Sequence, residues 1–367
     1  GIYTQVEQLN KTALKSHGLD SNGQLYKINS FEFYRYEDII KKEDDAGYDK
    51  TAFEKMLEIK GDSDHTKLID MLTDLNDYSI GIEDVLKEHF DEENIVYWMA
   101  FQILMGNVDT QNRNVYLYSP LNSDIWYFIA WDNDGCLMRP EYELRNFSDQ
   151  NSWEKGISNY WGNILFQRCL KSRSFREKLN DAILDLREYL NKDMLTSKIE
   201  SYKNVLKPYL YLMPDAEYEP LTSEQYDQIA ASLPDEIEKN YQLYLESLET
   251  PMPFYIGVPT IDGDKLKFNW DVSYDLDAED ITYSVEVARD YLFRDVIYKN
   301  TTLIVPEAEM DLPEAGQYFV RVRATNTSGK TQDAFDYYVT DEGKYYGMRC
   351  FYITEDSTVE EDDYEEG

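Results

Sequence analysis

Two polar segments of this sequence contain the residue types needed to transfer a phosphoryl group. The first contains Asp109 and, five residues later, Asn114, and the second contains Asp132 and Asp134. A carboxylate can accept the proton of an attacking hydroxyl, and carboxylate and amide oxygens together can hold Mg²⁺ against nucleotide phosphates. These side chains therefore predict a site for ATP and Mg²⁺ if the fold brings the two segments together.

The elements expected around the two segments would bring them together. Residues 94–105 are almost wholly apolar, which predicts a buried helix that ends at Gly106. Residues 115–118 and 126–131 are strand-like and are joined by turn-forming residues, which predicts a β-hairpin. Both polar segments then lie at strand ends, where a rigid scaffold can direct their side chains to one point.

The order of helix, Asp-x4-Asn loop, hairpin and Asp is that of the protein kinases, although neither the His-Arg-Asp nor the Asp-Phe-Gly signature is present. Four further motifs occur in order along the sequence. They are Gly-x-Tyr-x-x-x-Glu-Gln at 1–8, Gly-x-Leu-Tyr-Lys at 23–27, an Asn-x-Asp loop ending in Asn-x-Tyr at 107–116, and Trp-Asp-x-Asp at 131–134. With these motifs the sequence resembles the CotH-type kinases, a family of atypical secreted or spore-coat protein kinases. The helices up to about residue 250 fit the resemblance more loosely.

The resemblance implies an ATP- and Mg²⁺-dependent protein Ser/Thr kinase of bacterial origin. Asp109 would be the catalytic base, Asn114 and Asp132 would bind the metal ion, and Asp134 would assist them. The partner would be a protein substrate that presents a Ser or Thr hydroxyl.

One departure from the kinase pattern concerns the nucleotide. A kinase also needs a glycine-rich loop over the phosphates and a strand lysine paired with a helix glutamate, and these normally precede the motif found here at 1–8. We therefore expect most of the N-terminal lobe to be missing from this chain, and leave open whether this polypeptide is active by itself. Lys27 and Glu7 are the remaining candidates for nucleotide binding, and the alternative for Lys27 is a surface lysine on a hairpin.

Other chemistries have little support in the sequence. Residues 132–135 begin like a calcium loop, but Cys136 and Leu137 stand where the EF-hand pattern needs an oxygen ligand and a glycine. The three histidines are isolated from one another and from any nucleophile signature, which argues against His-based triads. The three cysteines form no CxxC pair, so zinc and a disulfide scaffold are poorly supported, and Cys136 is interpreted as a packing residue.

Composition excludes several classes of partner. The formal net charge of −36 would repel a nucleic-acid backbone, and no run of Lys or Arg forms a basic patch. The same sign disfavours anionic membrane surfaces, and no stretch approaches the roughly 20 apolar residues of a membrane-spanning helix. We expect a soluble chain without nucleic acid or a membrane span.

The C-terminal third has a different periodicity. After Pro251 and Pro253, the segments 266–270, 282–287 and 317–323 alternate apolar and polar residues, which indicates a β-sandwich. The module resembles a fibronectin type III domain, and nothing in it suggests catalysis. Such modules are usually spacers or protein- or glycan-binding units of extracellular proteins, so we expect a secreted or cell-surface location. The acidic tail, 359–367, is expected to be disordered. At the other end of the chain, residues 3–6 are strand-like and predict a short strand.

Together these patterns predict an α+β protein in three parts. A mainly helical kinase-like C-terminal lobe with a catalytic-loop β-hairpin spans 1–250, an all-β immunoglobulin-like (fibronectin III) sandwich spans 251–350, and a strand end with an acidic tail spans 351–367. The expected reaction is transfer of the γ-phosphoryl group of ATP to a secreted or surface protein. The rival hypothesis is a catalytically inactive, kinase-like scaffold or adhesion protein at the cell surface, which the appended binding module keeps open.

Overall fold

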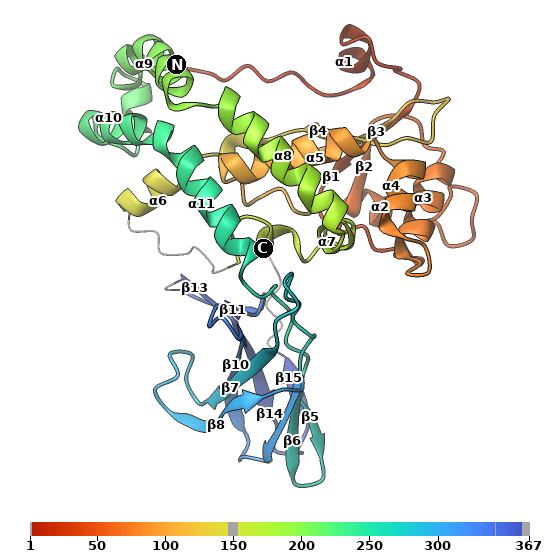
Figure 1. Cartoon of the computed structure of the whole chain (residues 1–367), viewed down its shortest axis with the longest axis vertical. Coiled ribbons are helices and arrows are strands. Elements are labelled where there is room, and N and C mark those ends of the chain that lie inside the picture. The colour runs from red at the N-terminus through yellow and green to blue at the C-terminus, as the bar shows by residue number, and fades with distance from the viewer. Residues whose placement is uncertain (1, 146–152, 342, 362–367) are drawn as a thin grey trace. The chain divides into compact units, whose positions relative to one another are not determined.

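The computed structural model describes residues 2–145, 153–341 and 343–361 of the 367-residue chain. The chain divides into two compact units, the first formed by Gly1–Asn146 and Tyr160–Leu243 and the second by Phe147–Asn159 and Tyr244–Gly367. The first unit is mainly helical and the second is mainly β-sheet (Figure 1). The expected mixed fold, with a helical part followed by a β part, is therefore confirmed.

A four-stranded antiparallel sheet lies within the first unit, with the strand order β2-β1-β3-β4. One face of this sheet carries Tyr26, Leu117 and Phe128, which pair across neighbouring strands and are buried. The opposite face carries Leu25 and the rings of two tyrosines against α1, in a smaller apolar cluster. The strands are β1 (Gln24–Ile28), β2 (Leu57–Ile59), β3 (Val115–Ser119) and β4 (Tyr127–Ala130).

The helix α5 (Glu92–Met105) forms the centre of the first unit. It is apolar on nearly all sides, as expected for a helix covered by neighbours all round. Trp98 stacks on Phe166 with 5.6 Å between ring centroids, and lies 5.0 Å from the ring of Phe128. The side chain of Asp91 caps the first turn by accepting a hydrogen bond from the amide of Asn94, and Gly106 ends the helix with a φ of 62°.

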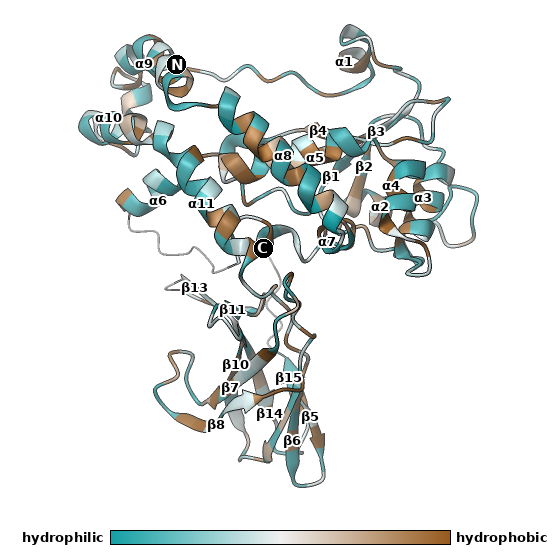
Figure 2. Cartoon of the chain, viewed as in Figure 1, coloured by the Kyte–Doolittle hydropathy of each residue, from teal (hydrophilic) through white to brown (hydrophobic). Residues whose placement is uncertain are grey.

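The other helices surround α5 and the sheet. In Figure 2 the helices α8 and α11 carry both polar and apolar residues, as expected for helices with one face on a core. The boundary between the two units, after Leu243, lies within α11. The helices are α1 (Lys11–Ser16), α2 (Lys50–Met56), α3 (Thr66–Asn76), α4 (Ile82–His89), α6 (Arg139–Arg145), α7 (Ile164–Lys171), α8 (Arg173–Tyr189), α9 (Lys192–Leu210), α10 (Ser223–Ser232) and α11 (Glu236–Leu248).

The second unit contains two antiparallel sheets that share one apolar core. The strand orders are β5-β6-β9 and β15-β14-β10-β7-β8, with β11 paired to β10. The shared core contains Phe268, Val285, Val320 and Phe351. A separate hairpin is formed by β12 (Tyr337–Thr340) and β13 (Gly343–Tyr346). The remaining strands are β5 (Thr260–Asp262), β6 (Lys265–Asn269), β7 (Ile281–Ala288), β8 (Val296–Leu303), β9 (Glu307–Asp311), β10 (Gly316–Asn326), β11 (Thr331–Asp333), β14 (Met348–Ile353) and β15 (Val359–Glu361).

Two local expectations from the sequence are wrong. The strand expected at 3–6 is absent, because residues 2–9 have no neighbouring strand and run without regular structure. The tail is not wholly disordered, because β15 pairs with β14, although 362–367 lie outside the described residues. Gly1, the first residue of one family motif, also lies outside them.

No helix in the described segments is long and apolar enough to cross a membrane.

Phe351 provides a test of the core that the two sheets share. Its side chain is 0% exposed, and its ring lies 6.0 Å from that of Phe268. We expect Phe351→Ala to lower the free energy of unfolding of the second unit by about 3–5 kcal/mol, because it removes apolar contacts and leaves a cavity. Calorimetric or denaturant unfolding would measure the loss. Val272→Ala, at a side chain that is 71% exposed, is the control and should cost less than about 0.5 kcal/mol. Similar losses in both variants would contradict the described core.

Candidate active site

The loop 107–114 begins where α5 ends and carries the predicted base. Gly106 has left-handed backbone geometry, which turns the chain sharply away from the helix axis. Asn114 then donates a hydrogen bond from Nδ2 to Oδ2 of Asp109 over 2.8 Å. The Nε atom of Arg113 lies 3.4 Å from Oδ1 of the same carboxylate. The predicted base and the first predicted metal ligand are therefore in direct contact.

The turn 132–135 follows β4 and lies against the start of this loop. Asp132 has a φ of 55°, and a short 3-10 turn, Asn133–Gly135, comes next. The amide of Leu137 donates to the carbonyl of Met105 over 2.8 Å. A Cβ atom on Gly135 would lie 2.7 Å from Oδ1 of Asn107. The close packing of the turn against the Asn107 side chain therefore favours a glycine at position 135. The fold thus brings together the two segments that the sequence singles out.

Three buried or half-buried amides connect the loop and the turn. Asn107 donates to Oε1 of Gln102 over 3.0 Å, and Gln102 donates to Oδ1 of Asn133 over 3.1 Å. Gln102 is 0% exposed and Asn107 is 2% exposed. Oδ1 of Asn107 in turn accepts a hydrogen bond from the amide of Asp109 over 3.3 Å. The sequence analysis assigned no role to Gln102, although one amide in an otherwise apolar helix is a signal that could have been used.

The electrostatic environment of Asp109 is unusual for an aspartate. Burial raises the pKa of its carboxyl above the ordinary value, and the negative charges of Asp134 and Asp132 raise this pKa further. The charge of Arg113 and the hydrogen bond from Asn114 lower the pKa of Asp109 and only partly offset these effects. Asp132 and Asp134 are therefore near enough to Asp109 to interact with it electrostatically, and a bound cation would offset their combined negative charge.

The two candidates for nucleotide binding lie in different surroundings. Lys27 is half-buried on β1 and pairs in register with Tyr116 of β3, two residues beyond Asn114. Within the described residues Lys27 forms no ion pair. Glu7 lies in the irregular N-terminal segment, where Oε2 contacts Nε2 of His17 at 2.7 Å. No contact of Glu7 with the loop, the turn or Lys27 is found among the described residues.

The donor set fits a magnesium ion that takes most of its ligands from phosphate and water. No group of three or more His, Cys, Asp or Glu residues in the described segments could by itself hold a metal ion. Mg²⁺ in nucleotide sites commonly uses only one or two protein carboxylates and completes its shell with phosphate and water oxygens. Asn114 and Asp132 supply oxygens of this kind, and Asp134 adds a further carboxylate near Asp109.

Cys136 follows the turn directly. Burial raises the pKa of its thiol to about 12, so the thiol is neutral at physiological pH, and it hydrogen-bonds with Asn107. A thiol in this state does not act as a nucleophile.

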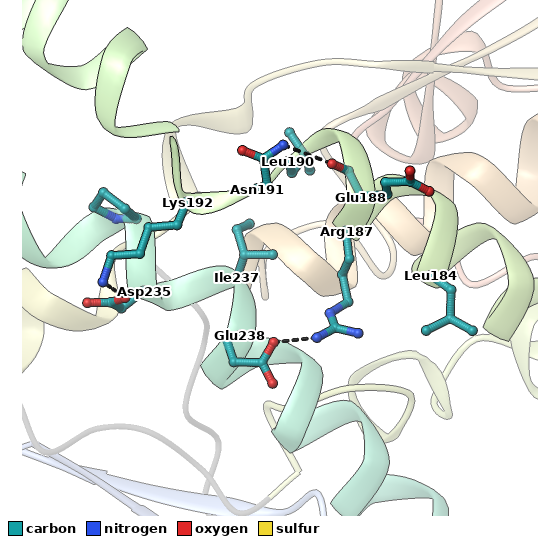
Figure 3. A pocket seen from close by; sticks show the side chains of 10 residues that line it. Leu184, Arg187, Glu188, Leu190, Asn191, Lys192, Asp235, Ile237 and Glu238 are labelled. Atoms are coloured by element: carbon teal, nitrogen blue, oxygen red, sulfur yellow. Dashed lines mark hydrogen bonds and ion pairs between the residues drawn. The ribbon is translucent and has the colours of Figure 1, made fainter. Parts of the chain in front are cut away.

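A groove elsewhere in the first unit contains none of the predicted site residues. It measures about 550 Å³ and lies between the end of α8 and the start of α11 (Figure 3). Its cations are already neutralised, because Arg187 pairs with Glu238 and Lys192 lies 2.5 Å from Asp235. The lining contains no residue of the loop 107–114 or the turn 132–135.

Comparisons with known proteins show the family of this chain. An Asp–Asn contact before a β-hairpin and two aspartates after it are the arrangement expected of a kinase-like protein. The family model described as CotH kinase protein matches residues 1–244, and the chain belongs to this family. No curated protein matches the chain. A structure of surface layer protein SbsC, domains 1–6, aligns with 90% of this chain and with 41% of the SbsC chain, at 11% identity. The TM-score of 0.15 does not indicate a shared fold.

Replacing Asp109 by Asn tests the electrostatic environment of the site. Because the pKa of Asp109 is raised in the folded protein, its ionised form destabilises the native state relative to the unfolded chain. Asn cannot ionise, so we expect Asp109→Asn to raise the melting temperature at about pH 7 by about 1–2 °C. The difference should disappear as the pH falls below about 4, where the aspartate is protonated in both states.

Thermal unfolding scans at a series of pH values would measure this difference. Asp70→Asn is the matched control, because Asp70 is exposed on α3 and forms no ion pair within the described residues. A gain in Asp109→Asn that persists at acidic pH would show that repulsion and burial of the charge are not its cause.

Proposed function

We propose that this chain is the catalytic lobe of an ATP- and Mg²⁺-dependent protein kinase that transfers the γ-phosphoryl group to a Ser or Thr hydroxyl. The observation that carries the proposal is the contact of Asp109 with Asn114 in the same electrostatic field as Asp132 and Asp134. Membership of the CotH kinase family supports it. The two segments with this chemistry are adjacent in the fold although separate in the sequence.

Asp109 is the group best suited to accept the proton of the acceptor hydroxyl. Its side chain is 52% exposed, so an incoming hydroxyl can reach it, and its raised pKa makes it a stronger base than an ordinary aspartate. In the proposed step the hydroxyl oxygen forms a bond to the γ-phosphorus, the bond to the bridging oxygen of ADP breaks, and the hydroxyl proton passes to Asp109. Arg113 and Asn114 hold the carboxylate in place.

Asn114 and Asp132 would hold the metal ion, with Asp134 assisting. When bound, Mg²⁺ would neutralise phosphate charge and align the nucleotide for transfer. Lys27 and Glu7 stay predictions for nucleotide binding. Lys27 is the better placed of the two, because its ammonium has no carboxylate partner among the described residues, whereas Glu7 is engaged by His17.

For the second unit we propose a binding role. The orders β5-β6-β9 and β14-β10-β7-β8 support a fibronectin III-type sandwich. Its partner would be an extracellular protein or glycan, which corresponds to a secreted or cell-surface location for the whole protein. An inactive kinase-like scaffold is the second candidate function, and the β-sheet unit that follows, which carries none of the candidate site residues, favours it.

Mg²⁺-dependent binding of ATP is the decisive measurement. We expect titration calorimetry to detect binding in the wild-type protein, and expect Asp132→Ala to weaken it at least about tenfold, because a charged ligand contact of this kind is worth about 1.5–3 kcal/mol. Asp124→Ala is the matched control, because Asp124 is an exposed aspartate in the connection between β3 and β4, away from the turn. It should leave the affinity unchanged. No binding by the wild-type protein would refute the proposed function.

The same preparation distinguishes an enzyme from a scaffold. Asp109→Asn should retain most of the Mg·ATP affinity but lose at least about a hundredfold in the rate of ADP formation, because general-base catalysis contributes on this scale. Equal rates of ADP formation in Asp109→Asn and the wild type would favour the scaffold.

A further inference from the structure

One side chain of α11 contacts the chain on both sides of the candidate site. Asn240 is 4% exposed. Its Nδ2 atom donates to the carbonyl of Leu104 over 2.9 Å, and its Oδ1 atom accepts from Nη2 of Arg139 over 2.6 Å. Leu104 lies just before the loop 107–114, and Arg139 lies just after the turn 132–135. A single buried amide therefore connects the start of one polar segment with the end of the other.

The end of α5 is packed closely against this amide. A Cβ atom on Gly106 would lie 2.7 Å from Nδ2 of Asn240, and Gly106 has a φ of 62°. Both facts require a glycine at the point where α5 turns into the loop. The side chain of Asn240 therefore packs directly on the backbone segment that leads into the loop with Asp109.

Arg139 is held on its other side by a buried carboxylate. Nη1 of Arg139 lies 3.3 Å from Oε2 of Glu236, a side chain that is 1% exposed. Lys239 contacts the other oxygen of Glu236 at 2.6 Å. The planar guanidinium can contact Glu236 and Asn240 at the same time, whereas the single ammonium of a lysine cannot reproduce this geometry. The two contacts of Arg139, with Glu236 and with Asn240, therefore favour an arginine over a lysine at this position.

We propose that Asn240 and Arg139 are positioning residues that fix the spacing between the loop 107–114 and the turn 132–135. The proposal rests on the function proposed above for these two segments. Neither residue needs to touch a substrate, because their effect passes through the backbone at Leu104 and through the start of α6. Small changes in the spacing of catalytic groups have large effects, since a displacement of about 1 Å can cost about a hundredfold in rate.

Hydrogen exchange tests the positioning without any ligand. Two amides report on it directly: that of Leu137, bonded to Met105, and that of Asp109, bonded to Asn107. In Asn240→Ala and in Arg139→Lys we expect both amides to exchange about tenfold faster or more. Lys239→Met is the matched control, because it removes a contact of Glu236 from the same helix turn but keeps the link through Asn240. Equal exchange of these amides in all variants would overturn the proposal.

Binding of Mg·ATP to the full chain then distinguishes positioning from simple stabilisation. Asn240→Ala and Arg139→Lys should weaken Mg²⁺-dependent binding about tenfold, whereas Lys239→Met should lower only the melting temperature. Faster exchange with unchanged affinity would overturn the positioning role. If the wild-type protein does not bind Mg·ATP, the proposed function fails, and the exchange comparison still decides whether Asn240 and Arg139 hold the two segments together.

Discussion

The burial of α5 on nearly all sides is the constraint on which the candidate site depends. A helix covered on most sides, with Trp98 stacked on Phe166, cannot shift along its axis without losing much of its packing. Its end at Gly106 is therefore fixed in space. The carbonyls of Leu104 and Met105, which accept hydrogen bonds from Asn240 and Leu137, are fixed with it. The loop and the turn take their positions from a rigid helix end, which is how a polar site can be built precisely on irregular backbone.

The site concentrates like charge where the fold alone would avoid it. Burial and the charges of Asp132 and Asp134 raise the pKa of Asp109, and the two neighbours that lower this pKa do not cancel the effect. Because the pKa of Asp109 is raised, its ionised form destabilises the folded state, and carboxylates of this kind are found most often at functional sites. A bound cation would offset this negative charge, as the proposed Mg²⁺ would.

Local sequence signals were sufficient for the parts of the site that local structure determines. The apolar run 94–105 and the hairpin predicted at 115–131 placed both polar segments correctly, because each element can be recognised from its own residues. The contact between Asn240 and Leu104 spans 136 residues and has no local signature. The same reason explains the errors at the termini. The segment 3–6 has strand-like residues but no partner, whereas β15 is acidic but finds one in β14.

A perturbed carboxylate is not by itself evidence for a catalytic site, and the two units show the difference. In the second unit, burial raises the pKa of Asp336, yet its side chain is only 7% exposed, its Oδ2 accepts from the amide of Ile256, and its Oδ1 contacts Arg349. Its hydrogen-bonding capacity is thus used within the fold, as expected for a structural group. Asp109 has a raised pKa as well, but about half of its side chain remains exposed, in the field of two further carboxylates. Accessibility beside further carboxylates, rather than the pKa shift alone, is therefore what distinguishes Asp109 from Asp336 and supports its proposed role as the base.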